Sequence, residues 1–140
     1  MDKIIKDIFE DVKSTNSIIQ SLVNELQEFQ DSNNLTNATA EERTVSNLFD
    51  ELLDCLEPVT NLVNYYRKPV RKMGLIQKNR NGRYELDDIE FICGSTIEIL
   101  FDRCRDGREE WMRTHIECAG GKYFAQGYPR DLAGAMVRIR

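Results

Sequence analysis

The chain has 140 residues with 24 acidic and 19 basic side chains, so its formal net charge is −5 and its length suits one medium domain or two small ones. The negative charge argues against indiscriminate binding to nucleic acid or to an anionic membrane. No stretch approaches the roughly 18 consecutive apolar residues of a membrane-spanning helix, and the first residues lack the apolar core of a secretory signal. We therefore expect a cytoplasmic protein with no membrane partner.

The charge is divided unevenly along the chain. Residues 1–66 hold 13 acids and 4 bases, whereas residues 67–140 hold 15 bases and 11 acids. Apolar side chains recur at helical spacing in the first part and in short alternating runs between glycines in the second. These contrasts predict an α+β protein with an acidic antiparallel helical hairpin at 1–67, a linker at 68–73 and a basic small β-barrel at 74–140.

One apolar stripe at three- and four-residue steps predicts a first helix over residues 2–30. Its members are Ile4, Ile5, Ile8, Phe9, Val12, Ile19, Leu22, Val23, Leu26 and Phe29. Residues 14–17 are poor helix formers, so a bend is expected there. The turn formers at 31–34 predict the end of the helix.

A second stripe predicts the partner helix. It comprises Val45, Leu48, Phe49, Leu52, Leu53, Leu56, Val59, Leu62, Val63 and Tyr66. Thr39 and Glu42 have the spacing of a capping box, and Arg67 suits the far end. Pro58 predicts a kink or a break at the preceding residue. Two helices cannot bury both stripes, so a third layer is needed: the C-terminal half, a second copy of the chain in a homodimer, or another protein.

Acidic side chains lie between the apolar positions of both stripes, and such faces are usually solvated. A sharper hypothesis is that this face imitates a phosphate backbone and enters a basic nucleic-acid channel. The candidate residues for this contact are Glu25, Glu28, Asp50 and Glu51.

The second half predicts short strands separated by turns. Asn81 and Gly82 form a hairpin-type turn pair before the first of them. The predicted strands cover residues 84–86, 89–92, 97–101, 111–118, 122–126 and 136–140. Five or six short strands at this spacing are typical of an SH3-like or similar small barrel.

Alternation along the strands assigns their residues to two faces. The residues predicted to point inward include Met112, Thr114, Ile116, Cys118, Val137 and Ile139. The outward residues form a candidate nucleic-acid face, basic with one aromatic side chain. They are Trp111, Arg113, His115 and Arg138, with Arg83 and Arg140 expected nearby. Glu85, Glu98 and Glu117 interleave with this set, which favours a solubilising surface instead.

Several motifs of the second half together resemble one family. They are GRYEL at 82–86, CGSTIEIL at 93–100, GKYF at 121–124, LAG at 132–134 and VRI at 137–139, with Trp111 ahead of Thr114, Ile116 and Glu117. On these residues the segment 73–140 resembles the small DUF5348 family, a domain of unknown function in Gram-positive bacteria and their mobile elements. The resemblance implies a compact β-barrel and brings no known catalytic residue. It also implies a shorter turn than the charged loop at 103–110.

The sequence gives little support to a metal site or to a nucleophilic catalytic site. The candidate zinc ligands are Cys93, Cys104, His115 and Cys118, but no Cys-x-x-Cys pair is present. His115 and Cys118 should face opposite sides of a strand, which also argues against a Cys–His catalytic pair. We expect no metal, cofactor or catalytic residue. We also expect buried thiols at Cys55, Cys93 and Cys118 and an exposed one at Cys104.

The sequence favours a non-enzymatic interaction protein of a phage or other mobile element, which docks on a protein or nucleoprotein partner. Two alternatives stay open. One is an anti-CRISPR-type inhibitor whose acidic helices block a DNA-binding channel. The other is a nucleic-acid-binding barrel with a helical dimerisation arm.

Overall fold

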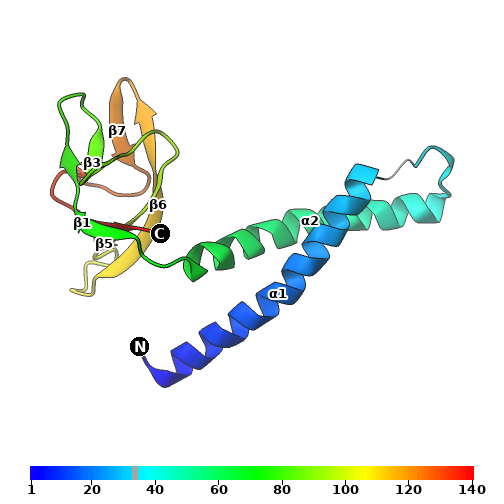
Figure 1. Ribbon diagram of the computed structural model, residues 1–140. Helices are drawn as coiled ribbons and strands as arrows, with labels where there is room; N and C mark the ends of the chain where they lie inside the picture. Colours follow the sequence, from blue (N-terminus) through cyan, green and yellow to red (C-terminus); the bar gives the residue numbers. More distant parts are fainter. Residues whose placement is uncertain (33–34) are drawn as a thin grey trace. The chain divides into compact units, whose positions relative to one another are not determined.

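The computed structural model describes residues 1–32 and 35–140, and they divide into two units, Met1–Lys68 and Pro69–Arg140. The first consists of helices and the second of antiparallel strands (Figure 1). We call them the helical unit and the sheet unit. Among the described residues, no helix combines the length and the apolar content needed to cross a membrane.

The helical unit contains α1 (Lys3–Ser32), a 3-10 turn η1 (Leu35–Asn37) and α2 (Ala40–Arg67). The predicted first helix is confirmed and extends two residues further, to Ser32. It runs without a break through residues 14–17. The predicted turn at 31–34 includes Asn33 and Asn34, which lie outside the described residues.

The start of α2 follows its predicted capping box. The Thr39 hydroxyl accepts the Glu42 backbone N–H at 3.2 Å, and the Glu42 carboxylate accepts the Thr39 backbone N–H at 2.7 Å. Of the kink or break predicted at Pro58, the break is wrong, because one helix continues from Ala40 to Arg67. Pro58 has no N–H for the carbonyl of Asp54, four residues earlier, and beside it the Thr60 hydroxyl donates to the Glu57 carbonyl at 2.9 Å.

The two helices pack antiparallel over a short core. Val23, Leu26 and Leu53 are its buried members. The Phe29 and Phe49 rings meet edge to face at 5.2 Å, and Gln30 donates to Asp50 at 2.6 Å. These contacts join residues near the ends of the hairpin loop, so the closed end of the hairpin is the better packed one.

The sheet unit is built from two antiparallel sheets. A five-stranded sheet has the order β1-β8-β5-β6-β7, and a three-stranded sheet has the order β2-β3-β4. The strands are β1 (Lys72–Leu75), β2 (Gln77–Lys78), β3 (Tyr84–Leu86), β4 (Ile89–Glu90), β5 (Thr96–Phe101), β6 (Glu110–Ala119), β7 (Lys122–Ala125) and β8 (Met136–Ile139). All six predicted strands are present. The described residues do not close into the predicted barrel, since no ladder joins the outer strand β7 to the smaller sheet.

The first two strands were not predicted, and the first half of β1, Lys72 and Met73, lies in the segment expected as a linker. They form one extended run that leaves the larger sheet at Ile76 and enters the smaller one. Ile76 is fully buried, and its backbone bonds to Ala135 at 3.0 Å and Gly134 at 2.8 Å. Within β1, a Cβ on Gly74 would approach the Leu86 side chain to 3.1 Å, so the glycine permits a close crossing of β3.

A single apolar core lies between the two sheets. Its buried members are Ile76, Tyr84, Leu86, Phe91, Ile97, Ile99, Ile116, Ala125, Leu132, Val137 and Ile139. The predicted inward residues Thr114, Ile116, Val137 and Ile139 are buried, and Met112 is half-buried. Cys118 is exposed because it pairs with Tyr123 near the end of the β6–β7 hairpin, away from this core.

Candidate interaction surfaces

The predicted basic face is assembled on one side of the larger sheet. Glu98 of β5 lies opposite Arg113 of β6 and Arg138 of β8 in the strand register. The Arg138 guanidinium stacks on the Trp111 ring at 4.2 Å from its centroid. His115 lies two residues beyond Arg113 on the same strand face and contacts Glu117 at 3.0 Å. The structure therefore brings together Trp111, Arg113, His115 and Arg138.

Glu98 neutralises much of this face. Its side chain is fully buried, bonds to Arg138, and accepts from Arg140 at 2.8 Å. Burial raises the pKa of Glu98, but the hydrogen bonds from Arg140 and Arg138 more than offset this, so the net pKa is lowered. The side chains of Arg138 and Arg140 are only 19% and 14% exposed. The prediction that Glu98 is a surface acid is wrong, and the face is a largely covered ion-pair cluster.

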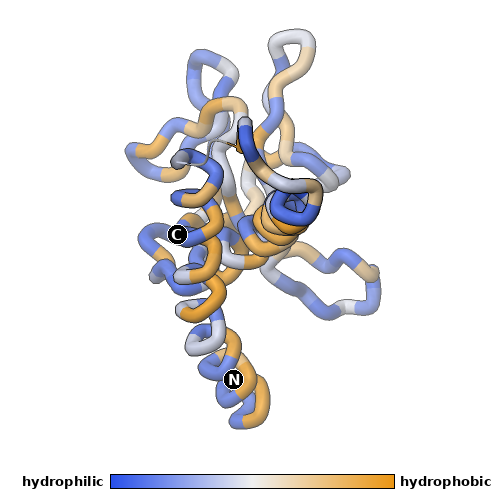
Figure 2. Tube along the Cα trace, turned by 90° about the vertical axis from the view of Figure 1, so that its right-hand side faces the viewer, coloured by the Kyte–Doolittle hydropathy of each residue, from blue (hydrophilic) through white to orange (hydrophobic). Residues whose placement is uncertain are grey.

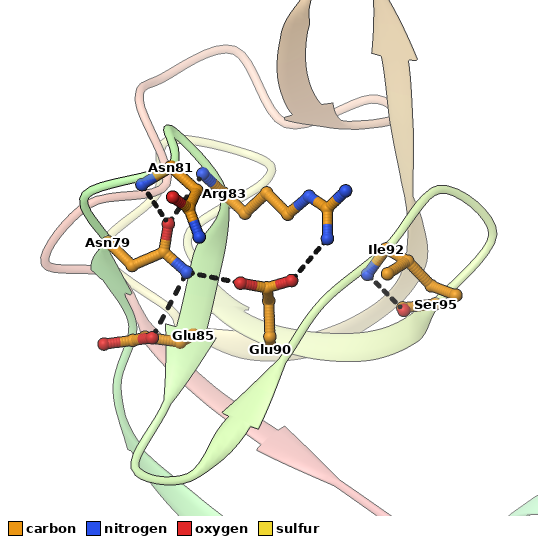
Figure 3. A network of polar contacts seen from close by, with 7 residues as sticks. All are labelled: Asn79, Asn81, Arg83, Glu85, Glu90, Ile92 and Ser95. Atoms are coloured by element: carbon orange, nitrogen blue, oxygen red, sulfur yellow. Dashed lines mark hydrogen bonds and ion pairs between the residues drawn. The ribbon is translucent and has the colours of Figure 1, made fainter.

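Arg83 does not join this cluster. It follows the β2–β3 turn, where its guanidinium contacts Glu90 at 2.5 Å (Figure 3). Asn79 braces the same turn: its amide donates to Glu90 at 2.6 Å and its carbonyl accepts the Asn81 and Arg83 backbone N–H groups. The hydrogen bond from Arg83 lowers the pKa of Glu90. In this network Arg83 stabilises the turn between β2 and β3.

The four acids proposed for mimicry are exposed but do not share one face. Glu25 and Glu28 are three residues apart on α1, so they lie on the same side of that helix. Asp50 and Glu51 are adjacent on α2 and so point about 100° apart. Asp50 accepts the Gln30 amide at the edge of the helix pair, whereas Glu51 points into solvent.

A groove between the helices is the surface that residue-by-residue reasoning missed. It has a volume of about 320 Å³ and is lined by Ile8, Asp11, Val12, Thr15, Asn16, Ile19, Val59 and Val63. Figure 1 shows α1 and α2 separating toward the N-terminus of α1, so the hairpin is open at this end. The signal in the sequence was the length of the first stripe, which begins at Ile4, many residues before the helices meet.

Apolar side chains continue from the groove along the first turns of α1. Hydrophobic positions recur along this helix as far as the marked N-terminus (Figure 2). Ile4, Ile5 and Ile8 are 69%, 58% and 57% exposed. We call the groove and these residues together the open-end surface.

One polar side chain in the groove has an unpaired atom. The Asn16 amide donates to Asn64 Oδ1 at 3.1 Å, and Asn64 in turn donates to Gln20 at 3.0 Å. Asn16 is only 2% exposed, yet its Oδ1 has no hydrogen-bond partner among the described residues. A buried acceptor without a donor costs about 1–3 kcal/mol. This unpaired acceptor lowers the stability of the helix pair beneath the groove.

The acids of the helical unit are concentrated away from this opening. Residues 25–57 hold nine acids and one base, whereas residues 2–13 hold four acids and three bases. The hairpin thus has a strongly negative closed end and a nearly neutral, apolar open end.

The cysteines depart from the prediction. Cys55, Cys93, Cys104 and Cys118 are all exposed and free, so the predicted burial of three of them is wrong. Cys55 follows the core residue Leu53 by two positions, which turns it to the opposite side of α2. No group of three or more His, Cys, Asp or Glu side chains in residues 1–32 and 35–140 is arranged to hold a metal ion.

Comparison with known proteins identifies one half of the chain. The chain matches no curated protein and no solved structure. Residues 73–139 match a family model described as a domain of unknown function, DUF5348. The matched segment starts inside β1 and ends with β8, and it excludes the helical unit. The match confirms the resemblance of the second half of the chain to this family, which its sequence motifs predicted.

Proposed function

We propose that this protein is a non-enzymatic interaction protein whose open-end surface binds an amphipathic helix of a partner protein. The exposed apolar groove between α1 and α2 is the observation that supports this function. A helix that laid its apolar side in the groove would supply the third layer that a two-helix unit lacks. The family resemblance makes an accessory protein of a phage or other mobile element the natural setting.

The energetics favour an occupant over a solvated groove. Full burial of a large apolar side chain is worth about 1.5–3 kcal/mol. Ile4, Ile5 and Ile8 are each more than half exposed, so their burial is available as binding free energy. The cost of association takes up part of this gain. The remainder fits a specific but reversible complex.

Charge selects the chemistry of the occupant. Residues 1–66 carry a net charge of −9, most of it at the closed end, so long-range repulsion disfavours a second copy of the chain and long-range attraction favours a basic partner. The partner helix is therefore apolar on one side and carries Lys or Arg at the flank that approaches the closed end.

The test compares two single substitutions on α1. Ile8→Asp places a charge in the groove, whereas Ile18→Asp places the same charge on an already 73% exposed site outside the groove lining. Proteins retained from nuclease-treated host lysate are identified, and a helical peptide from the retained protein is titrated against each variant by calorimetry. We expect Ile8→Asp to weaken peptide binding at least tenfold and Ile18→Asp to leave it unchanged.

Two results would overturn the proposal. Equal binding by both variants would remove the groove from the interaction. A concentration-dependent dimer in analytical ultracentrifugation that Ile8→Asp dissociates would assign the groove to a second copy of the chain.

The negative closed end supports a second candidate function, the blocking of a basic nucleic-acid channel by mimicry of phosphate charge, as in an anti-CRISPR inhibitor. Its test is replacement of Glu25, Glu28, Asp50 and Glu51 with Lys. If mimicry is the mechanism, inhibition of the nucleoprotein is abolished by this charge reversal and survives Ile8→Asp. The nucleic-acid-binding sheet has less support, because Glu98 offsets the charge of Arg138 and Arg140. Its test is Arg113→Glu, which should weaken binding only if the sheet contacts phosphates.

A further inference from the structure

Two of the four cysteines lie at one place in the sheet unit. Cys93 is in the turn that precedes β5, and Cys118 is near the end of β6. The turn is closed by a bond from the Ser95 N–H to the Ile92 carbonyl at 3.0 Å, and Gly94 takes a φ of 89°. A positive φ at the third position defines a type II turn and favours glycine there.

Backbone hydrogen bonds fix this turn against β6. The Gly94 N–H donates to the Ile116 carbonyl at 2.7 Å, and the Ile116 N–H donates to the Ser95 carbonyl at 2.8 Å. Two residues of one strand therefore oppose one residue of the other, which is a β-bulge with glycine at its first position. Cys93 precedes the bulge and thus lies beside the residues that follow Ile116, where Cys118 is found.

The strand register therefore places Cys93 and Cys118 next to each other, and both residues are open to solvent. A side-chain hydrogen bond with Cys93 is the main cause that raises the pKa of Cys118. Both residues are exposed, so a small oxidant can reach them. The other cysteines are placed differently: Cys55 is on α2 in the helical unit, and Cys104 is in the loop between β5 and β6.

We propose that Cys93 and Cys118 form an oxidisable thiol pair, which a peroxide converts to an intramolecular disulfide. In the first step the thiolate of one of the two cysteines attacks one peroxide oxygen, which gives a sulfenic acid and, with hydrogen peroxide, one water. In the second step the sulfur of the other cysteine attacks the sulfenic sulfur, so the S–S bond forms and a second water leaves. The two thiols lose two electrons and two protons in total, and one peroxide is reduced.

Either thiol can be oxidised first, because both residues are exposed and the register places each within reach of the other. The product would fasten the turn at residues 92–95 to the end of the β6–β7 hairpin.

The test treats the full chain with hydrogen peroxide, alkylates the remaining thiols with N-ethylmaleimide and measures the intact mass. We expect the loss of two hydrogen atoms, two alkylated cysteines, and a cross-linked peptide that joins Cys93 to Cys118 and disappears with dithiothreitol. Cys93→Ser and Cys118→Ser should each abolish the product. The matched variants Cys55→Ser and Cys104→Ser should retain it.

Other oxidation patterns would overturn the proposal. Four alkylated thiols, sulfinic acid at unconnected cysteines, or covalent dimers linked through Cys104 would each show that the pair does not close. Because this chemistry concerns the sheet unit alone, its outcome does not depend on whether the helical groove binds a partner.

Discussion

The sheet unit and the helical unit differ in how much of their apolar surface each buries within its own core. The sheet unit buries eleven apolar residues in one core, whereas the helical unit buries three. Large apolar side chains such as Ile4, Ile5 and Ile8 stay more than half exposed on α1. A domain that leaves such a stripe uncovered usually meets another surface there, so the helical unit is the place to look for a partner.

The two units also differ in how their charged side chains are paired. In the sheet unit, acids such as Glu98 and Glu90 meet arginines across the fold. In the helical unit the salt bridge described is the local pair of Lys13 and Glu10 on successive turns of α1. The sheet unit uses its charges internally, and the helical unit presents its acids to the surroundings.

The largest effect should come from breaking the buried ion cluster of the sheet unit. Glu98→Gln removes the negative charge that Glu98 supplies to Arg138 and Arg140 in a mostly covered site, and such a loss costs about 3 kcal/mol. Urea unfolding followed by fluorescence of Trp111, the one tryptophan of the chain, measures it. The exposed Glu109→Gln is the control. An unchanged midpoint for Glu98→Gln would mean that the arginines are solvated after all.

A smaller loss is expected in the helical unit on removal of the α2 cap. Thr39→Ala deletes the acceptor of the Glu42 N–H and should lower the free energy of unfolding of the helices by about 1 kcal/mol. Circular dichroism at 222 nm during urea unfolding follows it. Thr44→Ala makes the same change inside α2 and should be neutral or slightly stabilising. Equal losses for both variants would contradict a capping effect.

The third prediction concerns the buried polar side chain of the groove, whose replacement by an apolar one should stabilise the helical unit. Asn16→Leu removes the unpaired Oδ1 and adds apolar contact, but it also gives up the bond to Asn64. The net gain should be up to about 1 kcal/mol in the same unfolding assay. Asn61→Leu, on the exposed side of α2, is the control and should change little. A loss of stability in Asn16→Leu would show that the amide network outweighs its unpaired acceptor.

The smallest of the four expected effects is that of acidification, which should change the stability of the two units to different extents. The pKa of Asp131 is lowered by the Ala133 N–H and the Tyr84 hydroxyl, and that of Glu98 is lowered by Arg140 and Arg138 against the opposing effect of burial. Groups with a lowered folded pKa contribute stability that is complete above the unfolded values near about pH 4–5. That stability is lost as the pH falls through the folded values.

Acidification therefore weakens the sheet unit, while it removes repulsion among the crowded acids of the helical unit. Unfolding midpoints from Trp111 fluorescence should fall between pH 6 and pH 3 more steeply than those from the helical signal. Parallel slopes for the two signals would contradict this difference.

Local patterns were sufficient for most elements of the fold. The capping box at Thr39, the two helical stripes and the six strands from Tyr84 onward each carry their own signal of spacing or turn chemistry. The break proposed as one alternative at Pro58 was wrong, and α1 is continuous through residues 14–17, because the packing of the helical stripes outweighs weak local propensity and a single missing N–H.

The remaining features depend on contacts that are distant in sequence. β1 contains Gly74 and has only four residues, so it is recognised as a strand only through its pairing with β8. Glu98 looked like a surface acid because its two arginines lie about forty residues further along the chain. The groove depends on the angle between the two helices, which spacing alone does not specify.

The position of β8 has a consequence for how the chain acquires its structure. This strand lies between β1 and β5 in the larger sheet, and it pairs Lys72 with Ile139 across nearly the whole length of the unit. The larger sheet is therefore incomplete until residues 136–139 have left the ribosome, and its non-local pairing slows folding. The helices, whose contacts are mainly between neighbours in one hairpin, can form earlier. During synthesis the apolar surface of α1 is thus available to a partner before the sheet unit is finished.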